Sequence, residues 1–310
     1  MGLFNNFRRD SFHKKVDKLH KKVGKLFNQG KYLEALECND EILETDPENT
    51  DAWYDKGVIL NKLKKCQNAL KAYDKTLELD PNYVDAWYNK GNSFFELGMF
   101  KEAVDSFDKA LELDPDNADT WFNKGNVFAK LGRYQEAVES YDKALELDPK
   151  NTDVLYKVWF NKGNSFFELG MFHEALESYD KALELDPKNT DVWFNKGDSF
   201  FELGMFHEAL ESYDNALELD PKSINALNNK GGILRKLGKY DEALKCCNKA
   251  LEIDPNDAHI LHNKALVLKD IGMYNEALEC YDKALKIDPE YELALKGKEK
   301  VLKKISGGMD

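Results

Sequence analysis

Hydrophobic and polar residues alternate with a helical period in two neighbouring stretches of the chain, residues 85–97 and 101–113. In the first stretch, small and apolar residues recur at i, i+4, i+7 and i+8, which is one face of a helix: Trp87, Gly91, Phe94 and Phe95. The second stretch repeats the pattern with Ala103, Phe107, Ala110 and Leu111. Gly98 separates the two stretches, and Asp114-Pro115 follows the second, where proline cannot continue a helix. The pattern therefore predicts a helix–turn–helix unit followed by a short link.

This unit recurs along the 310 residues with a period of 34. All eight prolines share one phase of that period, with spacings of 34, 34, 34, 38, 34, 34 and 34 residues: Pro47, Pro81, Pro115, Pro149, Pro187, Pro221, Pro255 and Pro289. Alanines and glycines fill two further registers, where small side chains let helices approach within about 8–10 Å. The five tryptophans fill a fourth register, which we interpret as core packing rather than ligand stacking. The chain is predicted to be an all-α repeat array and not two unrelated domains.

The repeated pattern is W-x3-G-x2-[FY] followed by G-x-[FYC]-x2-A-x3-[FYC]-x2-A-x4-P, as in Trp87 to Pro115. It resembles the tetratricopeptide repeat family over residues 16–291. The resemblance implies a right-handed α-solenoid superhelix of helix-turn-helix repeats, in which the first helix of each repeat lines a concave groove. It also implies a non-enzymatic scaffold that binds a protein or an extended peptide in that groove.

The period divides the chain into three parts. Residues 1–15 form a basic N-terminal segment, residues 16–291 hold eight repeats, and residues 292–310 form a capping helix and tail. The repeats are expected at 16–49, 50–83, 84–117, 118–151, 156–189, 190–223, 224–257 and 258–291. The spacing of 38 reflects a four-residue insertion near residues 155–158, which is close to one helical turn and predicts a longer first helix in the fifth repeat. An insertion tolerated after duplication is favoured over a functional hinge.

The N-terminal segment allows two interpretations. Phe4, Phe7 and Phe12 alternate with arginines and lysines, which suits an amphipathic helix that docks on a membrane surface or a partner. The favoured alternative is that residues 11–29 form the first helix of the first repeat.

The net charge of −13 is unevenly distributed. Residues 1–27 carry +6 and residues 292–310 carry +2, so residues 28–291 carry −21. Such an acidic body repels phosphate backbones, and we expect no nucleic-acid partner. No apolar run reaches about 18 residues, so no membrane span is expected. The N-terminal residues do not resemble a secretory signal, and five cysteines without a CxxC pair suit a reduced, cytoplasmic protein.

No enzymatic motif interrupts the repeats. GxxxxGK[ST], GxSxG and HExxH are all missing from the sequence, so no catalytic residue and no cofactor is predicted. His259 and His262 lie at i and i+3 of one helix, but no third ligand accompanies them and no metal is expected. Cys246, Cys247 and Cys280 fall at core registers and are interpreted as small hydrophobic residues.

The predicted binding residues lie on the first helices, at positions that helix packing leaves open. They include a row of amides with a second, shorter row three residues later: Asn89, Asn123, Asn161, Asn195, Asn229 and Asn263, then Asn92, Asn126 and Asn164. An asparagine can pair with the C=O and the N–H of a peptide backbone, so a ladder of amides suits an extended segment. It is similar to the asparagine ladders of O-GlcNAc transferases, whose catalytic domain this chain lacks. The alternative is that asparagine is simply common at this register.

An aromatic residue precedes the ladder position in five repeats, although this position is Asp55 and not an amide in the second repeat: Tyr54, Tyr88, Phe122, Phe160 and Phe194. Family members that clamp a peptide carboxylate need a lysine there, so that clamp is not expected. The rings are predicted to bind apolar or aromatic ligand anchors, or else to pack on the neighbouring repeat. Acidic groove residues outnumber basic ones, which favours a neutral or basic partner. A different possibility is a self-assembling homo-oligomer, joined through the first repeat or the C-terminal helix.

Overall fold

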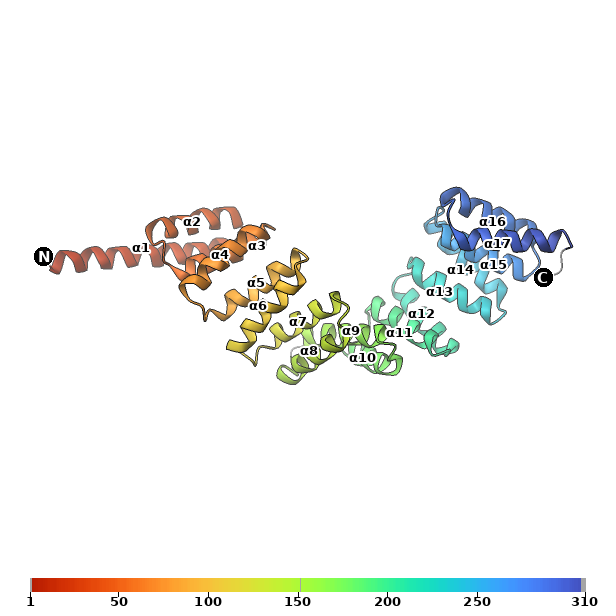
Figure 1. Ribbon diagram of the computed structural model, residues 1–310, viewed down its shortest axis with the longest axis horizontal. Coiled ribbons are helices and arrows are strands. Elements are labelled where there is room, and N and C mark those ends of the chain that lie inside the picture. Colours follow the sequence, from red (N-terminus) through yellow and green to blue (C-terminus); the bar gives the residue numbers. More distant parts are fainter. Residues whose placement is uncertain (1, 151, 308–310) are drawn as a thin grey trace. The chain divides into compact units, whose positions relative to one another are not determined.

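A computed structural model describes residues 2–150 and 152–307, with side chains from residue 14 onward except that of Asp153. The described residues form 17 α-helices and no β-strand. They divide into two compact units, Met1–Asn151 and Thr152–Asp310, which we call the N-terminal and C-terminal units (Figure 1). The all-α prediction is confirmed.

Successive helices form pairs joined by short turns (Figure 1). The N-terminal unit contains four pairs: α1 (Gly2–Asn28) with α2 (Tyr32–Thr45), α3 (Thr50–Lys62) with α4 (Cys66–Leu79), α5 (Val84–Glu96) with α6 (Phe100–Leu113), and α7 (Ala118–Lys130) with α8 (Tyr134–Leu147). The C-terminal unit contains four more and a last helix: α9 (Thr152–Glu168) with α10 (Phe172–Leu185), α11 (Thr190–Glu202) with α12 (Phe206–Leu219), α13 (Ile224–Lys236) with α14 (Tyr240–Ile253), α15 (Ala258–Asp270) with α16 (Tyr274–Ile287), and α17 (Glu292–Ile305).

The two helices of a pair approach closely because an aromatic ring of the second helix lies on a glycine of the first. A Cβ atom added to Gly91, Gly125, Gly163 or Gly197 would lie 2.6–2.7 Å from the nearest ring carbon, which is closer than packed carbon atoms come. The ring lies 16 residues after its glycine and is buried: Tyr73 on Gly57, Phe107 on Gly91, Tyr141 on Gly125, Tyr179 on Gly163 and Tyr213 on Gly197. This contact accounts for a glycine inside a helix, which otherwise costs about 1 kcal/mol.

The links between pairs explain why proline and tryptophan share the period. The indole Nε1 of Trp53, Trp87, Trp121 and Trp193 donates a hydrogen bond of 2.8–3.0 Å to the carbonyl oxygen of the preceding proline. The tryptophan ring is half-buried against the cores of adjoining pairs. These four tryptophans therefore pack in the core, as predicted, and also fix the link before their own helix.

Helix α9 has 17 residues, four more than α11. Its Val158 is buried at the core register that Val192 occupies in α11. The additional turn therefore precedes Val158 and lies at the start of the helix, as expected for a longer first helix.

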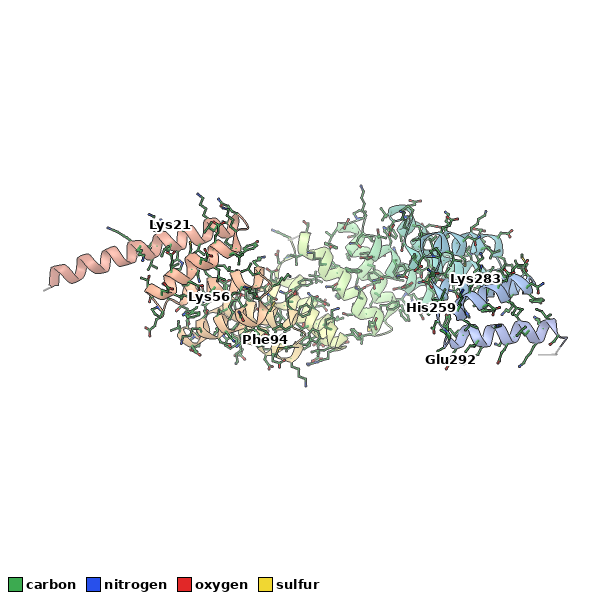
Figure 2. All side chains as sticks on the ribbon, turned by 90° about the horizontal axis from the view of Figure 1, so that it is seen from above. Lys21, Lys56, Phe94, His259, Lys283 and Glu292 are labelled. Atoms are coloured by element: carbon green, nitrogen blue, oxygen red, sulfur yellow. The ribbon has the colours of Figure 1, made fainter. Side chains whose placement is uncertain are left out.

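Helices α1 and α17 are the first and last helices of the described residues. Helix α1 begins at Gly2, earlier than the predicted residue 11, and Val16, Val23 and Leu26 are buried against α2. The side chains of Phe4, Phe7 and Phe12 lie outside the described residues. At the other end, α17 begins at Glu292 and lies beside α16, which carries Lys283 (Figure 2). No helix in the described ranges is long and apolar enough to cross a bilayer.

The ring-on-glycine contact can be tested with two alanine substitutions in the N-terminal unit. Gly125→Ala places a methyl group against Tyr141, and such overpacking costs about 1–3 kcal/mol, more than alanine gains in helix propensity. Gly24→Ala is the control, because a Cβ there meets no atom within 4 Å, and it should stabilise by up to about 1 kcal/mol. Urea unfolding followed by circular dichroism measures both. Equal effects of the two substitutions would contradict the contact.

Candidate functional site

The predicted binding residues all lie on one surface of each unit, which we call the first-helix face. It is formed by α3, α5 and α7 in the N-terminal unit and by α9, α11, α13 and α15 in the C-terminal unit. Every one of these side chains is half-buried: Tyr54, Tyr88, Asn89, Asn92, Phe122, Asn123, Asn126, Phe160, Asn161, Asn164, Phe194, Asn195, Asn229 and Asn263. The face is therefore only partly open to solvent.

In the N-terminal unit the amides connect one first helix to the next. Asn123 of α7 donates to the Tyr88 hydroxyl at 2.9 Å and to Asn92 Oδ1 at 3.0 Å, both on α5. Asn89 of α5 donates to the Tyr54 hydroxyl of α3 at 3.1 Å. Both Nδ2 hydrogens of Asn123 are thus used inside the protein.

The C-terminal unit repeats this arrangement. Asn195 of α11 donates to Asn164 Oδ1 of α9 at 2.8 Å, and Asn229 of α13 donates to Asp198 Oδ1 of α11 at 2.9 Å. The two amide rows predicted from the sequence are therefore brought together, with Asp198 standing in for an amide. The sequence did not predict that the two rows pair with each other.

Tyrosine hydroxyls of the second helices complete the network, and sequence reasoning missed them. Tyr141 donates to Asn126 at 2.9 Å, Tyr179 to Asn164 at 2.8 Å, and Tyr213 to Asp198 at 2.5 Å. A signal was present in the sequence, because only one ring carries a hydroxyl in four of the five ring pairs, the exception being Tyr54 with Tyr73: Tyr88 with Phe107, Phe122 with Tyr141, Phe160 with Tyr179, and Phe194 with Tyr213.

The aromatic row packs inside the protein. The rings of Tyr54, Tyr88, Phe122, Phe160 and Phe194 lie 5.8–6.3 Å, centroid to centroid, from the second-helix ring of their own pair. The ring partner of each belongs to the same pair, and the hydroxyls of Tyr54 and Tyr88 also accept hydrogen bonds from Asn89 and Asn123 of the next pair, so these two side chains contact the neighbouring repeat as well. Tyr54 adds a contact of 5.0 Å with Tyr83 in the following link.

The amide oxygens remain available. The Oδ1 atoms of Asn89, Asn123, Asn195 and Asn229 accept no hydrogen bond from the residues with described side chains, and none of them is sealed from solvent. A half-buried carbonyl oxygen that points to water can accept a hydrogen bond from a ligand. The face thus offers acceptors more than donors.

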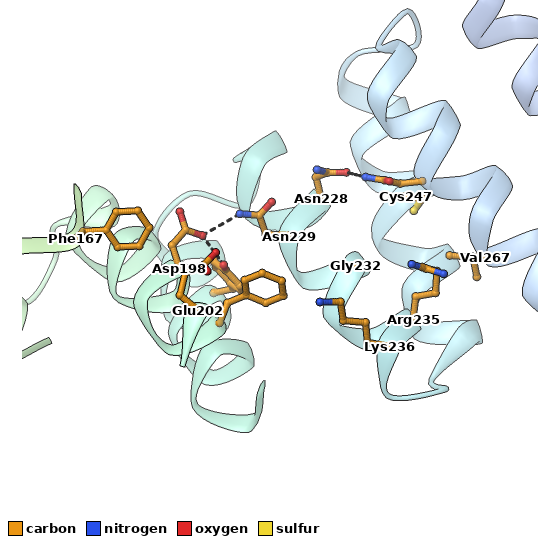
Figure 3. A pocket seen from close by; sticks show the side chains of 14 residues that line it. Phe167, Asp198, Glu202, Asn228, Asn229, Gly232, Arg235, Lys236, Cys247 and Val267 are labelled. Atoms are coloured by element: carbon orange, nitrogen blue, oxygen red, sulfur yellow. Dashed lines mark hydrogen bonds between the residues drawn. The ribbon is translucent and has the colours of Figure 1, made fainter. Parts of the chain in front are cut away.

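Three pockets lie on the first-helix face. In the C-terminal unit, a pocket of about 320 Å³ spans α9, α11, α13 and α15, and a second of about 350 Å³ adjoins it at Phe167 and Asp198. In the N-terminal unit, a pocket of about 270 Å³ is lined by Asn89, Asn92 and Tyr73 among others. Figure 3 shows Asp198 and Glu202 on one side of the first pocket, with Gly232, Arg235 and Lys236 on the other.

Burial changes the acid–base behaviour of the network. It raises the pKa of the Asp198 carboxyl, against the opposing effect of the hydrogen bonds from Tyr213 and Asn229. Burial, together with nearby carboxylates, raises the pKa of Tyr54 to about 12. The hydroxyl of Tyr54 therefore stays protonated at neutral pH.

The structure shows no arrangement typical of a metal or redox site among the described residues. No group of three or more His, Cys, Asp and Glu side chains there could hold a metal ion. His259 Nδ1 instead lies 2.9 Å from the Tyr291 hydroxyl, and His262 is buried against the rings of Tyr281 and Tyr291. Cys246, Cys247 and Cys280 are buried and free, and burial raises their pKa.

The buried carboxyl of Asp198 gives a pH-dependent prediction. Because its pKa is higher in the folded chain, the folded state binds the proton more tightly, and stability is lost as the pH rises through that pKa. Asp198→Asn reproduces the Asn164 arrangement and should raise the free energy of unfolding at pH 7 by on the order of 1 kcal/mol. At pH 3 the gain should vanish, since the carboxyl is then protonated in both states. Thermal melts at the two pH values measure this.

The control for that experiment is Glu211→Gln, an exposed change on α12, which should alter stability by less than about 0.5 kcal/mol at either pH. A gain for Asp198→Asn that is equal at pH 3 and pH 7, or a loss at pH 7, would contradict the role of burial.

Comparisons with known proteins agree with the helix pairs. Models described as tetratricopeptide repeat match residues 25–84, 60–118 and 88–152, residues 156–189 and 190–223, and residues 222–290. A search of curated protein sequences finds no match.

Several solved structures resemble the chain. YrrB, described as a TPR protein with an unusual peptide-binding site, is 30% identical over 62% of this chain and 97% of its own, with a TM-score of 0.56. PilF of Pseudomonas aeruginosa is 21% identical over 70% of this chain and 97% of its own, with a TM-score of 0.58. The Cut9-Hcn1 structure of the APC/C is 23% identical over 92% of this chain and 55% of its own, with a TM-score of 0.57. The last two show the fold alone.

The 34-residue period, the ring-on-glycine helix pairs and these matches all indicate one architecture, a helical repeat solenoid of the kind that serves as a protein-interaction scaffold. The chain belongs to the tetratricopeptide repeat family.

Proposed function

We propose that the protein is a non-enzymatic scaffold that binds an extended segment of a partner protein on its first-helix face. The observation that carries this proposal is the set of open amide oxygens, at Asn89 and Asn123 in the N-terminal unit and at Asn195 and Asn229 in the C-terminal unit, of which all but Asn123 line a pocket. An extended backbone presents its N–H groups at regular intervals, which a regular series of acceptors suits. Five free cysteines fit a reducing compartment such as the cytoplasm.

The internal hydrogen bonds sharpen how such a segment would be held. Because the Nδ2 groups of Asn123 and Asn89 already donate within the protein, these amides act toward a ligand as acceptors. The sequence predicted that each asparagine pairs with both the C=O and the N–H groups of the ligand backbone. With the Nδ2 groups occupied, these asparagines can pair only with the N–H groups of the ligand. The same internal bonds hold each amide in place, so little side-chain freedom is lost on binding.

The charge of the face favours a neutral or basic segment. Seven of its acidic residues are exposed: Asp51, Asp85, Glu96, Asp119, Glu168, Asp191 and Glu202. The exposed lysines of the face are fewer, Lys62 and Lys130 in the N-terminal unit and Lys157 and Lys236 in the C-terminal unit. Exposed ion pairs are worth under about 1 kcal/mol each, so added salt should weaken binding only modestly.

The likeness to YrrB adds to the proposal, because YrrB is described as a TPR protein with a peptide-binding site and is 30% identical. The match covers 62% of this chain, a longer stretch than either unit alone. That this chain also binds a peptide is part of the proposal, which the likeness to YrrB supports.

A peptide selected from a random display library on the full chain provides the test of the amide series. Asn195→Ala combined with Asn229→Ala removes two acceptors, each worth about 1 kcal/mol, so the dissociation constant of the peptide should rise about thirtyfold. Isothermal titration calorimetry measures the change. Circular dichroism checks the fold, because the same substitutions remove two internal hydrogen bonds.

Asn275→Ala is the matched control, an exposed amide on the second helix α16, and it should leave binding unchanged. The proposal fails if no peptide is selected, or if the double substitution leaves the dissociation constant unchanged within error.

Self-association is a second candidate, supported by the outer surface of α17. Ala294, Gly297 and Val301 bury the inner surface of this helix against its neighbours, while three large apolar side chains remain 43–49% exposed: Leu295, Leu302 and Ile305. These three lie within one sector of the helix, which is typical of a contact surface.

Light scattering over a range of protein concentrations tests this second candidate. If α17 joins two copies, the mass should rise with concentration toward that of a dimer, and Leu295→Glu with Leu302→Glu should abolish the rise. A mass that stays at 35.6 kDa throughout would exclude association through this helix.

A further inference from the structure

The pair α13–α14 lacks three side chains that form the core of the network in the preceding pair. Where α11–α12 has Phe194, Asp198 and Tyr213, the residues 34 positions later are Asn228, Gly232 and Cys247. The stacked ring, the hydroxyl and the acceptor of that hydroxyl are thus all replaced by smaller groups. The glycine that receives the ring is retained as Gly231.

Gly231 consequently has no ring lying on it. A Cβ atom added at Gly197 would lie 2.7 Å from a ring carbon of Tyr213. The three atoms nearest to a Cβ at Gly231 would be Cys246 Cβ at 3.3 Å, the Ala243 carbonyl oxygen at 3.6 Å and Cys247 Sγ at 3.8 Å, none of which belongs to a ring. A Cβ at the adjacent Gly232 would meet nothing within 4 Å.

The space left by these replacements is the pocket of about 320 Å³ on the first-helix face (Figure 3). Gly231 and Cys247 are buried beneath it, Phe201 and Val267 add apolar walls, and Asn228 and Asn229 add polar edges. An apolar cavity of about 150 Å³ holds a benzene molecule, so this pocket has room for an aromatic side chain and part of the backbone that carries it.

The hydrogen bonds around the pocket have rearranged so that its centre stays open. In the preceding pairs, an asparagine such as Asn229 donates to the residue 31 positions earlier, here Asp198. For Asn263, the residue 31 positions earlier is Gly232, which has no side chain that could accept. Asn263 donates instead to Asn228 Oδ1 at 2.7 Å. No polar side chain therefore crosses the place that Asp198 occupies one pair earlier.

We propose that this pocket binds an aromatic side chain, phenylalanine or tyrosine, of the extended partner segment. The proposal rests on the proposed function and names the anchor that the segment would carry. The protein itself supplies the precedent, because five of its helix pairs seat a phenylalanine or tyrosine ring on the equivalent glycine. An incoming ring makes at Gly231 the contact that Tyr213 makes at Gly197.

The charges around the pocket suit a neutral aromatic group with an uncharged or basic neighbour. Arg235 is paired with Asp270 at 2.7 Å, and the Lys236 ammonium lies 4.3 Å from the centre of the Phe201 ring. Asp198 and Glu202 remain on the opposite side (Figure 3). An acidic side chain in the ligand would approach these two carboxyl groups, whereas a ring avoids that repulsion.

The test uses amino-acid amides as probes and the full chain as receptor. N-acetyl-phenylalaninamide and N-acetyl-tyrosinamide should bind with dissociation constants on the order of 1 mM in ligand-observed NMR. N-acetyl-leucinamide should bind at least several-fold more weakly, because it lacks a flat ring for the Gly231 surface. Equal binding of the leucine and aromatic probes would overturn the proposal.

The decisive variant restores the pattern of the other pairs. Cys247→Tyr with Gly232→Asn fills the pocket with the Tyr179–Asn164 arrangement, and binding of the aromatic probes should weaken at least tenfold. Gly232→Asn alone, which fills only the mouth, should weaken it several-fold and covers the case in which the double variant does not fold. Cys280→Ala is the control, a buried cysteine outside the pocket, and should leave probe binding unchanged. Unaltered binding to the Gly232→Asn variant would overturn the proposal.

Display selection separates this proposal from the proposed function. Peptides that are selected by the chain, depend on Asn195 and Asn229, and show no aromatic enrichment would leave the scaffold function standing and overturn the aromatic anchor. Aromatic probes that bind in the pocket, with no peptide selected, would instead overturn the scaffold function while the pocket assignment stands.

Discussion

The contact between a second-helix ring and a first-helix glycine is the interaction on which the rest of the structure depends. It sets how closely the two helices of a pair approach, and it recurs in five consecutive pairs from Gly57 with Tyr73 to Gly197 with Tyr213. The glycine cannot be changed while the ring is present, because a Cβ on it would collide with the ring. Each pair thereby has its own packed centre, and neighbouring pairs add to it through the links and the first-helix face.

The same ring connects packing to the surface. The hydroxyls of Tyr141, Tyr179 and Tyr213 extend to the first-helix face and donate to Asn126, Asn164 and Asp198 respectively, whereas the Tyr73 hydroxyl accepts from Asn61. Asn164 also accepts a hydrogen bond from Asn195 of the next pair, and Asp198 accepts one from Asn229 of the next pair. A single side chain thus fixes the distance between helices and also positions the polar groups of the candidate binding surface. Function at this surface therefore cannot be separated from stability.

The sequence predicted the helices well because proline, glycine and tryptophan act locally. Proline cannot continue a helix into the link, and α5 and α6 begin and end within one residue of the predicted ranges 85–97 and 101–113, whereas α1 begins at Gly2, before the predicted residue 11. The hydrogen bonds of the amide rows were not predictable in the same way. They depend on a tyrosine hydroxyl 15 residues away, and on an amide in the next pair. The pocket was missed because Cys247 was assessed as a small hydrophobic residue in a core register. Cys247 stands where the preceding pair has the ring of Tyr213. The loss of this ring leaves an open space only because Gly231 and Gly232 stand beside Cys247, so the three residues have to be considered together.

The tryptophan–proline links have a consequence for how the molecule can be observed. All five indoles lie between Trp53 and Trp193, on first helices α3 to α11, and α13 to α17 contain none. Intrinsic fluorescence excited at the indole band therefore reports on α3 to α11 and, through Trp193, on the side of α13 that packs against it, and it has no probe in α14 to α17. Repeat arrays gain and lose structure through nearest-neighbour contacts, so the C-terminal pairs can open while the emission stays constant. A tryptophan introduced at Leu227 or Leu261, which stand at the same register, would give this end of the array its own optical signal.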